Sequence, residues 1–403
     1  MRNSKKIILR FAMLALILLI TMFVFAACTE QPDMPSNSEN KIHTTGIRSP
    51  FDIAEYGDYI YFSNPTVFKY NRSNGKLTKA CDDPECAGNC HLEDLITMVS
   101  HVYDGKMFFS SLNPKTRSYT YSYMDIITKE IKVLCEFFEN ERPGLGKPIV
   151  ENGYIYYIRN MLKPDGDSKN ADDYILTACR IPETGGDEQM ICHFDSKLDN
   201  IITVYNDSII SYNQFAINMY AVATGEKTVL FDFAEQGYVS AYNFTFSNGK
   251  LYYCATSTET VYSEYRKTEF SKPYMISLDV DSGEFRRVIE EPVFNFCLAE
   301  DKAYYTKFEL RHLYVPDDYE TNPGKTKILL VGDTLYCCDH NGENSSKVFA
   351  KSNMDFSLTY TVIENKFYGL ISDYDTDSNT FGKYYFACID PETGDVIPAI
   401  TEN

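Results

Sequence analysis

Residues 151–160 read ENGYIYYIRN, and the pattern in this stretch decides the fold. Its Asn152-Gly153 dipeptide favours a two-residue hairpin turn, because both central residues of such a turn need a positive φ angle. The residues after the turn are mainly aromatic and β-branched, which is typical of a β-strand. The stretch therefore predicts a tight turn that leads into an aromatic strand.

The same pattern recurs along the chain after residue 50, and the recurrence has a register. Aromatic strands follow first turns at Gly57-Asp58, Asp104-Gly105, Asn152-Gly153, Asn206-Asp207, Asn248-Gly249, Glu300-Asp301 and Glu364-Asn365. A second turn follows each first turn, at Asn74-Gly75, Thr128-Lys129, Thr184-Gly185, Thr224-Gly225, Ser282-Gly283, Asn341-Gly342 and Thr393-Gly394. Because a short strand comes after each second turn, every unit holds four strands.

Residues 51–403 hold seven such units of about 50 residues each, which is the size of a propeller blade. One four-stranded sheet cannot bury both of its faces, whereas a closed ring of sheets leaves no face uncovered. No linker or break in composition interrupts this range, which argues against a β-sandwich or two smaller β-domains. We therefore predict an all-β fold with a single β-propeller of seven four-stranded blades, and six or eight blades as alternatives. The longest unit, at 301–349, carries an insertion around YVPDDYETNPGKTK that makes the blade count harder to read.

The N-terminus has the pattern of a bacterial lipoprotein signal. A basic segment precedes an apolar run from Phe11 to Ala27, and Phe25-Ala26-Ala27-Cys28 resembles a lipobox, whose cysteine receives a diacylglycerol. We predict that residues 1–27 form a signal peptide and that Cys28 carries the lipid. The alternative is an uncleaved transmembrane anchor, although the apolar run is short for a membrane span. Both interpretations place the rest of the chain at a membrane, on its extracytoplasmic side.

The segment after the signal peptide has the composition of a linker. Residues 28–50 are rich in Pro, Ser, Asn and Glu without apolar periodicity, and we interpret them as a disordered tether behind the lipidated cysteine. The net charge is −19, and it becomes −23 once the four basic residues of the signal are removed. Such an acidic body disfavours nucleic acid as a partner. It suits a soluble domain held beside a membrane by its lipid, or a protein that binds cations or basic partners.

The stretch CDDPECAGNCHLED, residues 81–94, connects the first unit to the second and contains four candidate ligands. Cys81, Cys86, Cys90 and His91 have the donor types of a tetrahedral zinc site, although adjacent residues rarely bind one ion. A disulfide between two of the cysteines is a second interpretation, and free thiols are a third. The third is favoured by the cysteines that lie in apolar strands elsewhere, at Cys135, Cys179, Cys192, Cys254, Cys297 and Cys388.

A second metal candidate lies near the C-terminus. Asp373, Asp375 and Asp377 stand at alternate positions, as carboxylates do in calcium loops. The glycine and the closing glutamate of an EF-hand are missing, and the alternative is a solvated hairpin tip.

The chain as a whole resembles uncharacterised bacterial lipoproteins with a β-propeller similar to that of low-density-lipoprotein-receptor-related proteins. The resemblance is based on the lipobox, on strand starts of the form Asn-Gly-x-[Ile/Leu]-Tyr-Tyr and on the [Ser/Thr]-Gly turns, while the Tyr-Trp-Thr-Asp core of the receptor repeat is missing. It implies architecture and location, with no activity attached.

For function, the sequence favours a lipid-anchored binding or scaffold module at the bacterial cell surface. Tyrosines in the connections, at Tyr262, Tyr265, Tyr314 and Tyr319, predict an aromatic surface for a protein, peptide or glycan ligand. The alternative is an extracytoplasmic hydrolase or lyase with its site at the central mouth of the propeller, assembled from several blades. No linear catalytic motif is recognised in the sequence.

Overall fold

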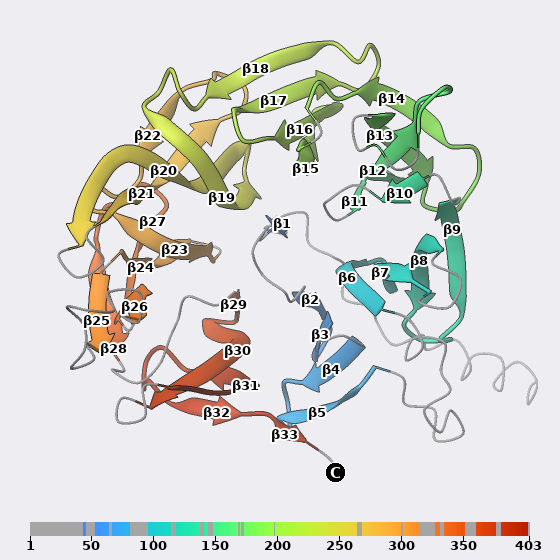
Figure 1. Cartoon of the computed structure of the whole chain (residues 1–403). Coiled ribbons are helices and arrows are strands. Elements are labelled where there is room, and N and C mark those ends of the chain that lie inside the picture. The colour runs from blue at the N-terminus through green and yellow to red at the C-terminus, as the bar shows by residue number, and fades with distance from the viewer. Residues whose placement is uncertain are drawn as a thin grey trace, which may run out of the picture. The chain divides into compact units, whose positions relative to one another are not determined.

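The repeat units fold into seven antiparallel sheets of four main strands in the computed structural model (Figure 1). The structure describes residues 43–45, 53–63, 67–80, 96–113, 118–137, 141–143, 148–167, 170, 173–196, 198–263, 268–299, 301–308, 310–314, 327–330, 334–350, 360–375 and 380–401. These residues contain no helix that is long and apolar enough to span a bilayer. The predicted all-β propeller with seven four-stranded blades is confirmed.

The first four blades follow one another along the chain. Blade 1 consists of β2 (Ile53–Tyr56), β3 (Tyr59–Ser63), β4 (Val67–Asn71) and β5 (Lys76–Lys79). Blade 2 consists of β6 (Ile96–Tyr103), β7 (Lys106–Leu112), β8 (Tyr119–Asp125) and β9 (Ile131–Phe137). Blade 3 consists of β11 (Ile149–Glu151), β12 (Tyr154–Leu162), β13 (Tyr174–Pro182) and β14 (Gln189–His193), and β10 (Glu141–Pro143) also pairs with β12. Blade 4 consists of β15 (Asn200–Tyr205), β16 (Ser208–Tyr212), β17 (Ala216–Ala221) and β18 (Lys227–Asp232).

The remaining three blades include one with an inserted hairpin. Blade 5 consists of β19 (Tyr238–Ser247), β20 (Lys250–Ser263), β21 (Thr268–Asp279) and β22 (Phe285–Arg287). Blade 6 consists of β23 (Val293–Leu298), β24 (Lys302–Lys307), β27 (Thr334–Asp339) and β28 (Ser346–Ala350). Its insertion forms a separate hairpin, β25 (Leu310–Tyr314) and β26 (Lys327–Leu330), and adds no blade. Blade 7 consists of β29 (Tyr360–Ile363), β30 (Lys366–Asp375), β31 (Thr380–Ile389) and β32 (Val396–Pro398).

The predicted turns have the backbone conformation that their residues favour. Both residues of a first turn have positive φ angles at Asp104-Gly105, Asn152-Gly153, Asn206-Asp207, Asn248-Gly249 and Glu364-Asn365. In the second turns the last residue has a positive φ angle, and it is glycine except at Lys129. Since every strand pair within a blade is antiparallel, both kinds of turn lie at the same end of the sheet.

The two faces of the ring therefore differ. We call the face with the first and second turns the tight-turn face. The opposite face carries the connections between second and third strands and those between blades, and we call it the long-connection face. The hairpin β25–β26 is inserted there, and so is the distal part of the long hairpin β20–β21.

The core consists of seven apolar clusters, one between each pair of neighbouring blades. Between blades 4 and 5, for example, Ile210 and Phe231 pack with Tyr253 and Ile276. The ring is closed where blade 7 meets blade 1, and there the rings of Phe62 and Phe386 stack with centroids 4.5 Å apart. A last strand, β33 (Ile400–Thr401), pairs with β5 in parallel and ties the chain's end to blade 1.

One strand lies within the stretch predicted as a tether. Strand β1 (His43–Thr45) pairs with β19 in blade 5, while the other residues of 28–50 lie outside the described part of the chain. Figure 1 shows β1 inside the ring, toward its centre.

The turn glycines provide a test of how the blades pack. Gly342 has a φ angle of +82°, and a Cβ atom there would overlap the carbonyl oxygen of Val288 in the preceding blade. Gly283 has a φ angle of +74° but nothing within 4 Å of such an atom. We expect Gly283→Ala to lower the free energy of unfolding by about 1 kcal/mol, and Gly342→Ala by about 3 kcal/mol, because overpacking adds to the backbone strain. Urea denaturation measures both, and equal losses would contradict the close blade contact.

Candidate binding surface on blades 4 and 5

Three connections on the long-connection face are joined by backbone hydrogen bonds. The carbonyl oxygen of Phe215, between β16 and β17, accepts from the amide of Phe233 at 2.9 Å. The carbonyl oxygen of Phe233, between blades 4 and 5, accepts from the amide of Tyr238 at 2.7 Å. The carbonyl oxygen of Gly237 in turn accepts from the amide of Thr258 on β20 at 3.0 Å. Blades 4 and 5 therefore present their connections as one linked layer.

A buried carboxylate organises the blade 4 part of this layer. Asp199 is 1% exposed and accepts hydrogen bonds from Ser211 Oγ and from Asn213 Nδ2, each at 3.2 Å. The Oδ1 atom of Asn213 then accepts from the amides of Phe215 and Ala216 at 2.9 and 3.0 Å. Burial raises the pKa of Asp199, and its donors oppose that shift. The carboxylate thus fixes the turn that holds Phe215 at the surface.

Four large apolar side chains are exposed on the long-connection face of blades 4 and 5, including the connection that enters blade 4. Phe215 is 61% exposed, and the others are Leu198, Val239 and Tyr262 at 46%, 51% and 49%. Each stands in a connection or at the strand end that adjoins it, so all four belong to the long-connection face. Exposed apolar side chains on one face make that face a candidate interaction site.

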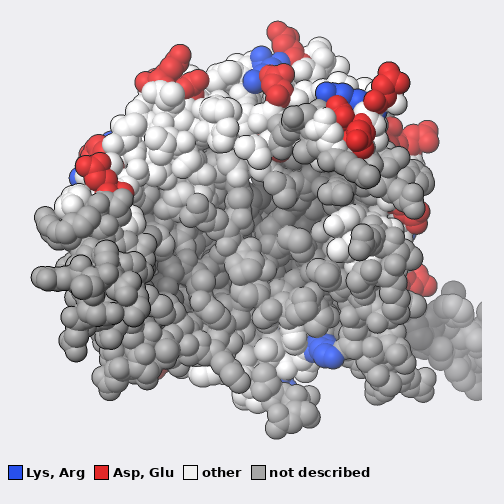
Figure 2. Space-filling view, viewed as in Figure 1, with Lys and Arg blue, Asp and Glu red and all other residues white. Residues whose placement is uncertain are grey.

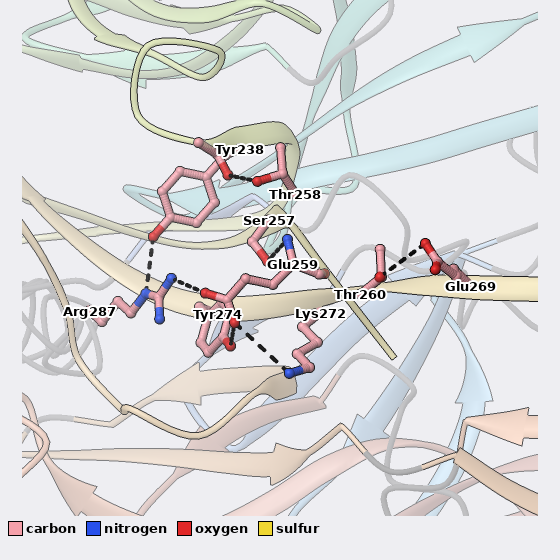
Figure 3. Close-up of polar contacts among 10 residues, drawn as sticks. Tyr238, Ser257, Thr258, Glu259, Thr260, Glu269, Lys272, Tyr274 and Arg287 are labelled. Carbon is pink, nitrogen blue, oxygen red and sulfur yellow. Dashed lines mark hydrogen bonds and ion pairs between the residues drawn. The ribbon is translucent and has the colours of Figure 1, made fainter. Parts of the chain in front are cut away.

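A polar cluster on blade 5 joins the long hairpin β20–β21 to the neighbouring strands β19 and β22 (Figure 3). The Glu259 carboxylate accepts from Arg287 Nη2 at 2.9 Å and from the Tyr274 hydroxyl at 2.7 Å, with Lys272 Nζ 3.9 Å away. The Arg287 guanidinium lies over the Tyr274 ring, 3.8 Å from its centroid, and its Nε donates to the Tyr238 hydroxyl at 3.3 Å. We call these five residues the Glu259 cluster, and together with the four apolar side chains they form the blade 4–5 surface.

Hydrogen bonds and burial set the protonation states of Glu259 and Tyr274 in this cluster. The hydrogen bond from Arg287, followed by that from Tyr274, lowers the pKa of Glu259. Burial and the hydrogen bond to Glu259 raise the pKa of Tyr274 to about 12. At neutral pH Glu259 is therefore an anion held by neighbouring donors, and Tyr274 is a neutral donor. This arrangement suits recognition by charge, hydrogen bonds and an aromatic ring rather than proton transfer.

Charges are unevenly distributed over the described surface. Figure 2 shows Asp and Glu side chains along the upper and right-hand outer edge of the ring, with a few Lys and Arg among them. Between this edge and the centre, the described atoms of the same view are mostly uncharged. A partner with basic groups would be attracted to the edge and would meet a less polar surface further in.

A second polar cluster lies between blades 2 and 3 and fastens them together. Arg159 Nη2 is 2.6 Å from Glu188 Oε2 and 2.9 Å from Cys135 Sγ, and its guanidinium lies over the Phe137 ring, 4.9 Å from the centroid. Tyr157 also donates to Glu188. Arg159 and Tyr157 stand on β12, whereas Cys135 and Phe137 belong to β9 of the neighbouring blade. We assign this cluster a structural role because it bridges two sheets.

Most of the site residues predicted from the sequence lie outside the described residues. These are Cys28, Cys81, Cys86, Cys90, His91 and Asp377. Strand β5 ends at Lys79 and β6 begins at Ile96, so the cysteine-rich stretch does connect blades 1 and 2, as predicted. Asp373 and Asp375 belong to β30, where Asp375 pairs with Thr380 next to the hairpin connection. Within the described part of the chain, no group of three His, Cys, Asp or Glu side chains is placed to hold a metal ion.

The cysteines in the strands keep their thiols. None of the eight described cysteines forms a disulfide: Cys135, Cys179, Cys192, Cys254, Cys297, Cys337, Cys338 and Cys388. The six that were predicted to lie in blade strands do so. Burial raises the pKa of Cys179, Cys192 and Cys338 to about 12, so these thiols stay protonated at neutral pH. They act as small apolar side chains between the blades.

Sequence reasoning found one member of the blade 4–5 surface and missed the rest. Tyr262 is exposed as expected but belongs to β20, Tyr314 ends β25, and Tyr265 and Tyr319 lie outside the described residues. Glu259 and Arg287 are far apart in the sequence, and no local pattern marks them as partners. The Asp199–Asn213 pair likewise depends on how β15 and β16 are aligned.

Comparisons with known proteins establish the fold alone. No protein-family description and no curated protein matches the chain. Among solved structures, an acylaminoacyl peptidase in complex with a chloromethyl ketone is 14% identical, with a TM-score of 0.54 over 89% of this chain and 52% of that one. A prolyl endopeptidase is 8% identical, with a TM-score of 0.54 over 88% and 50%. An oligogalacturonate lyase in complex with manganese is 9% identical, with a TM-score of 0.51 over 82% and 84%.

These similarities support a β-propeller fold. They do not support the particular propeller family that the sequence resembles. The chain spans about half the length of the two peptidases. The named structures are not low-density-lipoprotein-receptor-related proteins, so the expected likeness to that particular propeller is not supported. At such low identity, a shared fold does not carry an activity from one protein to another.

The Glu259 cluster predicts a pH-dependent contribution to stability. Because the folded-state pKa of Glu259 lies below its ordinary value of 4.5, its contribution is present above pH 4.5 and is lost as the pH falls through the folded-state value. We expect Glu259→Gln to lower the free energy of unfolding at neutral pH by less than about 1 kcal/mol, since the pair is exposed. The difference from wild type should shrink in acid.

Urea denaturation from neutral pH to below pH 4.5 measures this difference. Glu226→Gln, which changes an exposed carboxylate in a turn of blade 4, is the matched control. A loss in Glu259→Gln that stays constant with pH would contradict the role of the ionised carboxylate.

Proposed function

We propose that the protein is a lipid-anchored, extracytoplasmic module that binds a protein segment through the blade 4–5 surface. The observation that carries the proposal is the combination of four exposed apolar side chains with the Glu259 cluster on one linked layer of connections. Rings such as Tyr262 supply contact area at a low cost in side-chain entropy. Arg287 and Lys272 beside Glu259 supply charged groups for polar contacts at the edge of the interface.

The chemistry of the partner follows from charge. The full chain has a net charge of −19, and the acidic side chains in Figure 2 lie at the outer edge of the ring. Complementary charge speeds association and excludes acidic competitors. We infer a basic protein or peptide with apolar side chains, and we retain the prediction that nucleic acid is not a partner.

The alternative predicted from the sequence is a hydrolase or lyase with its site at the central mouth. The similar structures include an oligogalacturonate lyase and two kinds of peptidase, which gives this alternative a precedent on the same fold. Function belongs to the site and not to the fold. Zinc at the Cys81–His91 stretch and calcium at 373–377 stay predictions as well.

The anchor is tested by Cys28→Ser in the full-length protein expressed in a bacterium. We expect the variant to lose fatty-acid incorporation and to leave the membrane fraction or stay unprocessed, because serine lacks the thiol that accepts the lipid. Metabolic labelling with an alkyne fatty acid and cell fractionation measure this, with Cys81→Ser as the matched control. Label on the variant would contradict the site, and an unlabelled wild-type protein that retains residues 1–27 would favour the transmembrane anchor.

The binding surface is tested by photo-cross-linking in cells. A benzophenone amino acid placed at Tyr262 or at Phe215 should give one discrete adduct, because both side chains are exposed on the blade 4–5 surface. The same group at Val133, which is exposed on the outer strand of blade 2, is the control. Glu259→Lys should weaken the Tyr262 adduct, because it reverses the charge beside it. Adducts of equal size and yield at all three positions, or none at the first two, would overturn the proposal.

A further inference from the structure

The long hairpin of blade 5 continues beyond its sheet as a two-stranded ribbon. Strand β20 pairs with β19 only as far as Ser257, and it pairs with β21 as far as Ser263. On the side of β19, the connection from blade 4 reaches Thr258, whose amide donates to the carbonyl oxygen of Gly237. Among the described residues, no strand pairs with that edge of β20 at 260–263. The backbone of the ribbon is therefore open along this edge.

Blade 3 shows how such an edge is completed in this protein. Its strand β12 also extends beyond the strand that precedes it, because β11 pairs with residues 154–156 alone. Strand β10 covers the next part of the same edge, where it pairs with residues 159–161 in antiparallel register. Strand β20 has the position in blade 5 that β12 has in blade 3, and no described strand does for it what β10 does for β12. A third strand would stabilise the ribbon, since two strands alone are marginally stable.

The position of Pro273 in β21 shows which backbone groups face the open edge. Proline has no amide hydrogen, so position 273 is one at which the backbone groups face away from β20. Orientation alternates along an antiparallel strand, so the groups of Ser271 also face away from β20, and those of its partner Thr260 face away from β21. The same holds for Glu269 and its partner Tyr262. The amide and carbonyl groups of Thr260 and Tyr262 therefore point to the open edge.

The two edges of the ribbon differ in how well they suit a further strand. Strand β21 contains Lys272 and Pro273, and these two residue types are the ones that proteins place on exposed edges to prevent pairing. Residues 260–263 read TVYS and contain neither type. Their β-branched and aromatic side chains favour an extended backbone. We therefore expect the edge of β20, and not that of β21, to accept a strand.

The side chains of the ribbon define the chemistry of the added strand. Val261 and Phe270 are paired, and both are half-buried on one face of the ribbon. Tyr262 and Glu269 are paired on the other face, and both are exposed. Glu269 also accepts a hydrogen bond from Thr260 Oγ1 at 3.1 Å (Figure 3). Because side chains alternate along a strand, a segment with apolar and basic residues at alternate positions would match an apolar face and a carboxylate-bearing face.

We propose that the partner adds an extended strand to the edge of β20 at 260–263, with apolar and basic side chains at alternate positions. This mode of binding rests on the proposed function, because Tyr262 belongs to the blade 4–5 surface. Backbone hydrogen bonds to Thr260 and Tyr262 supply the affinity, and the alternating side chains supply the specificity. The added strand takes the position in blade 5 that β10 has in blade 3.

Strand addition is tested with a defined probe, the acetylated and amidated hexapeptide Lys-Val-Lys-Val-Lys-Val. Hydrogen exchange of the full-length protein, resolved to single amides, measures its effect. At a peptide concentration about ten times the Kd, we expect the amides of Thr260 and Tyr262 to exchange about tenfold more slowly, because only the free fraction exchanges. The amide of Ser271, which faces the opposite edge, should exchange as before.

The hexapeptide Glu-Val-Glu-Val-Glu-Val is the control for charge. It should slow exchange at Thr260 and Tyr262 less than the basic peptide does, because its carboxylates face those of the ribbon. Exchange at both amides that is unchanged at every concentration of the basic peptide, or that slows equally with the acidic one, would overturn the proposal.

The partner in the cell is tested with proline at the same edge. Thr260→Pro removes an amide hydrogen that faces the open edge, and Ser271→Pro removes one that faces the other edge. With the benzophenone amino acid at Phe215, we expect Thr260→Pro to lower the adduct yield about fivefold through the lost hydrogen bond. Ser271→Pro should leave the yield unchanged, and so should Thr260→Val, which keeps the amide and loses the hydroxyl. Equal losses in the two proline variants would overturn the proposal.

The outcomes separate strand addition from the proposed function. Slower exchange with the basic peptide, together with no adduct from Tyr262 or Phe215 in cells, would overturn the proposed function and leave strand addition in place. Adducts from both positions, together with unchanged exchange and equal yields in the two proline variants, would overturn strand addition and leave the binding surface in place.

Discussion

Contact between consecutive sheets is the interaction on which the rest of the structure depends. Each blade has two apolar faces and can bury them only against its two neighbouring blades. The last blade must therefore pack against the first, which closes the ring. The stacked rings of Phe62 and Phe386 lie at the junction where it does so, and β33 adds backbone pairing to the same junction. Large aromatic side chains suit this task because each one covers much apolar area. A chain with 32 Tyr and 26 Phe can fill seven such interfaces without tryptophan.

The fold was predictable because its signals are local. The Asn152-Gly153 turn and the six others that match it set the strand length and the strand number within each unit, and the structure keeps that register. Lys129 stands where the other second turns have glycine, yet its φ angle of 63° shows that the position in the repeat decides the conformation. The blade 4–5 surface was not predictable to the same degree. Glu259 contacts Arg287 only because β20 extends beyond its blade. No local sequence pattern predicts that extension.

The buried thiols illustrate how the same packing constraint shapes chemistry. Cysteine between two sheets loses the solvent that would stabilise a thiolate, and burial raises the pKa of Cys179 accordingly. Its reactivity is thereby suppressed, while its volume still fills the interface. An extracytoplasmic location permits disulfides, but the eight cysteines in the described strands form none.

The antiparallel order of the strands in a blade also gives the two faces of the ring different connections. The connections on one face are short, with two to six residues between strands, and a side chain at Gly342 would strike the preceding blade. The extended hairpins of blades 5 and 6 lie on the other face. Strand β1 begins opposite Phe246, near the tight-turn end of β19. The proposed binding surface thus lies at the end of the strands where a four-stranded sheet has its longer connections.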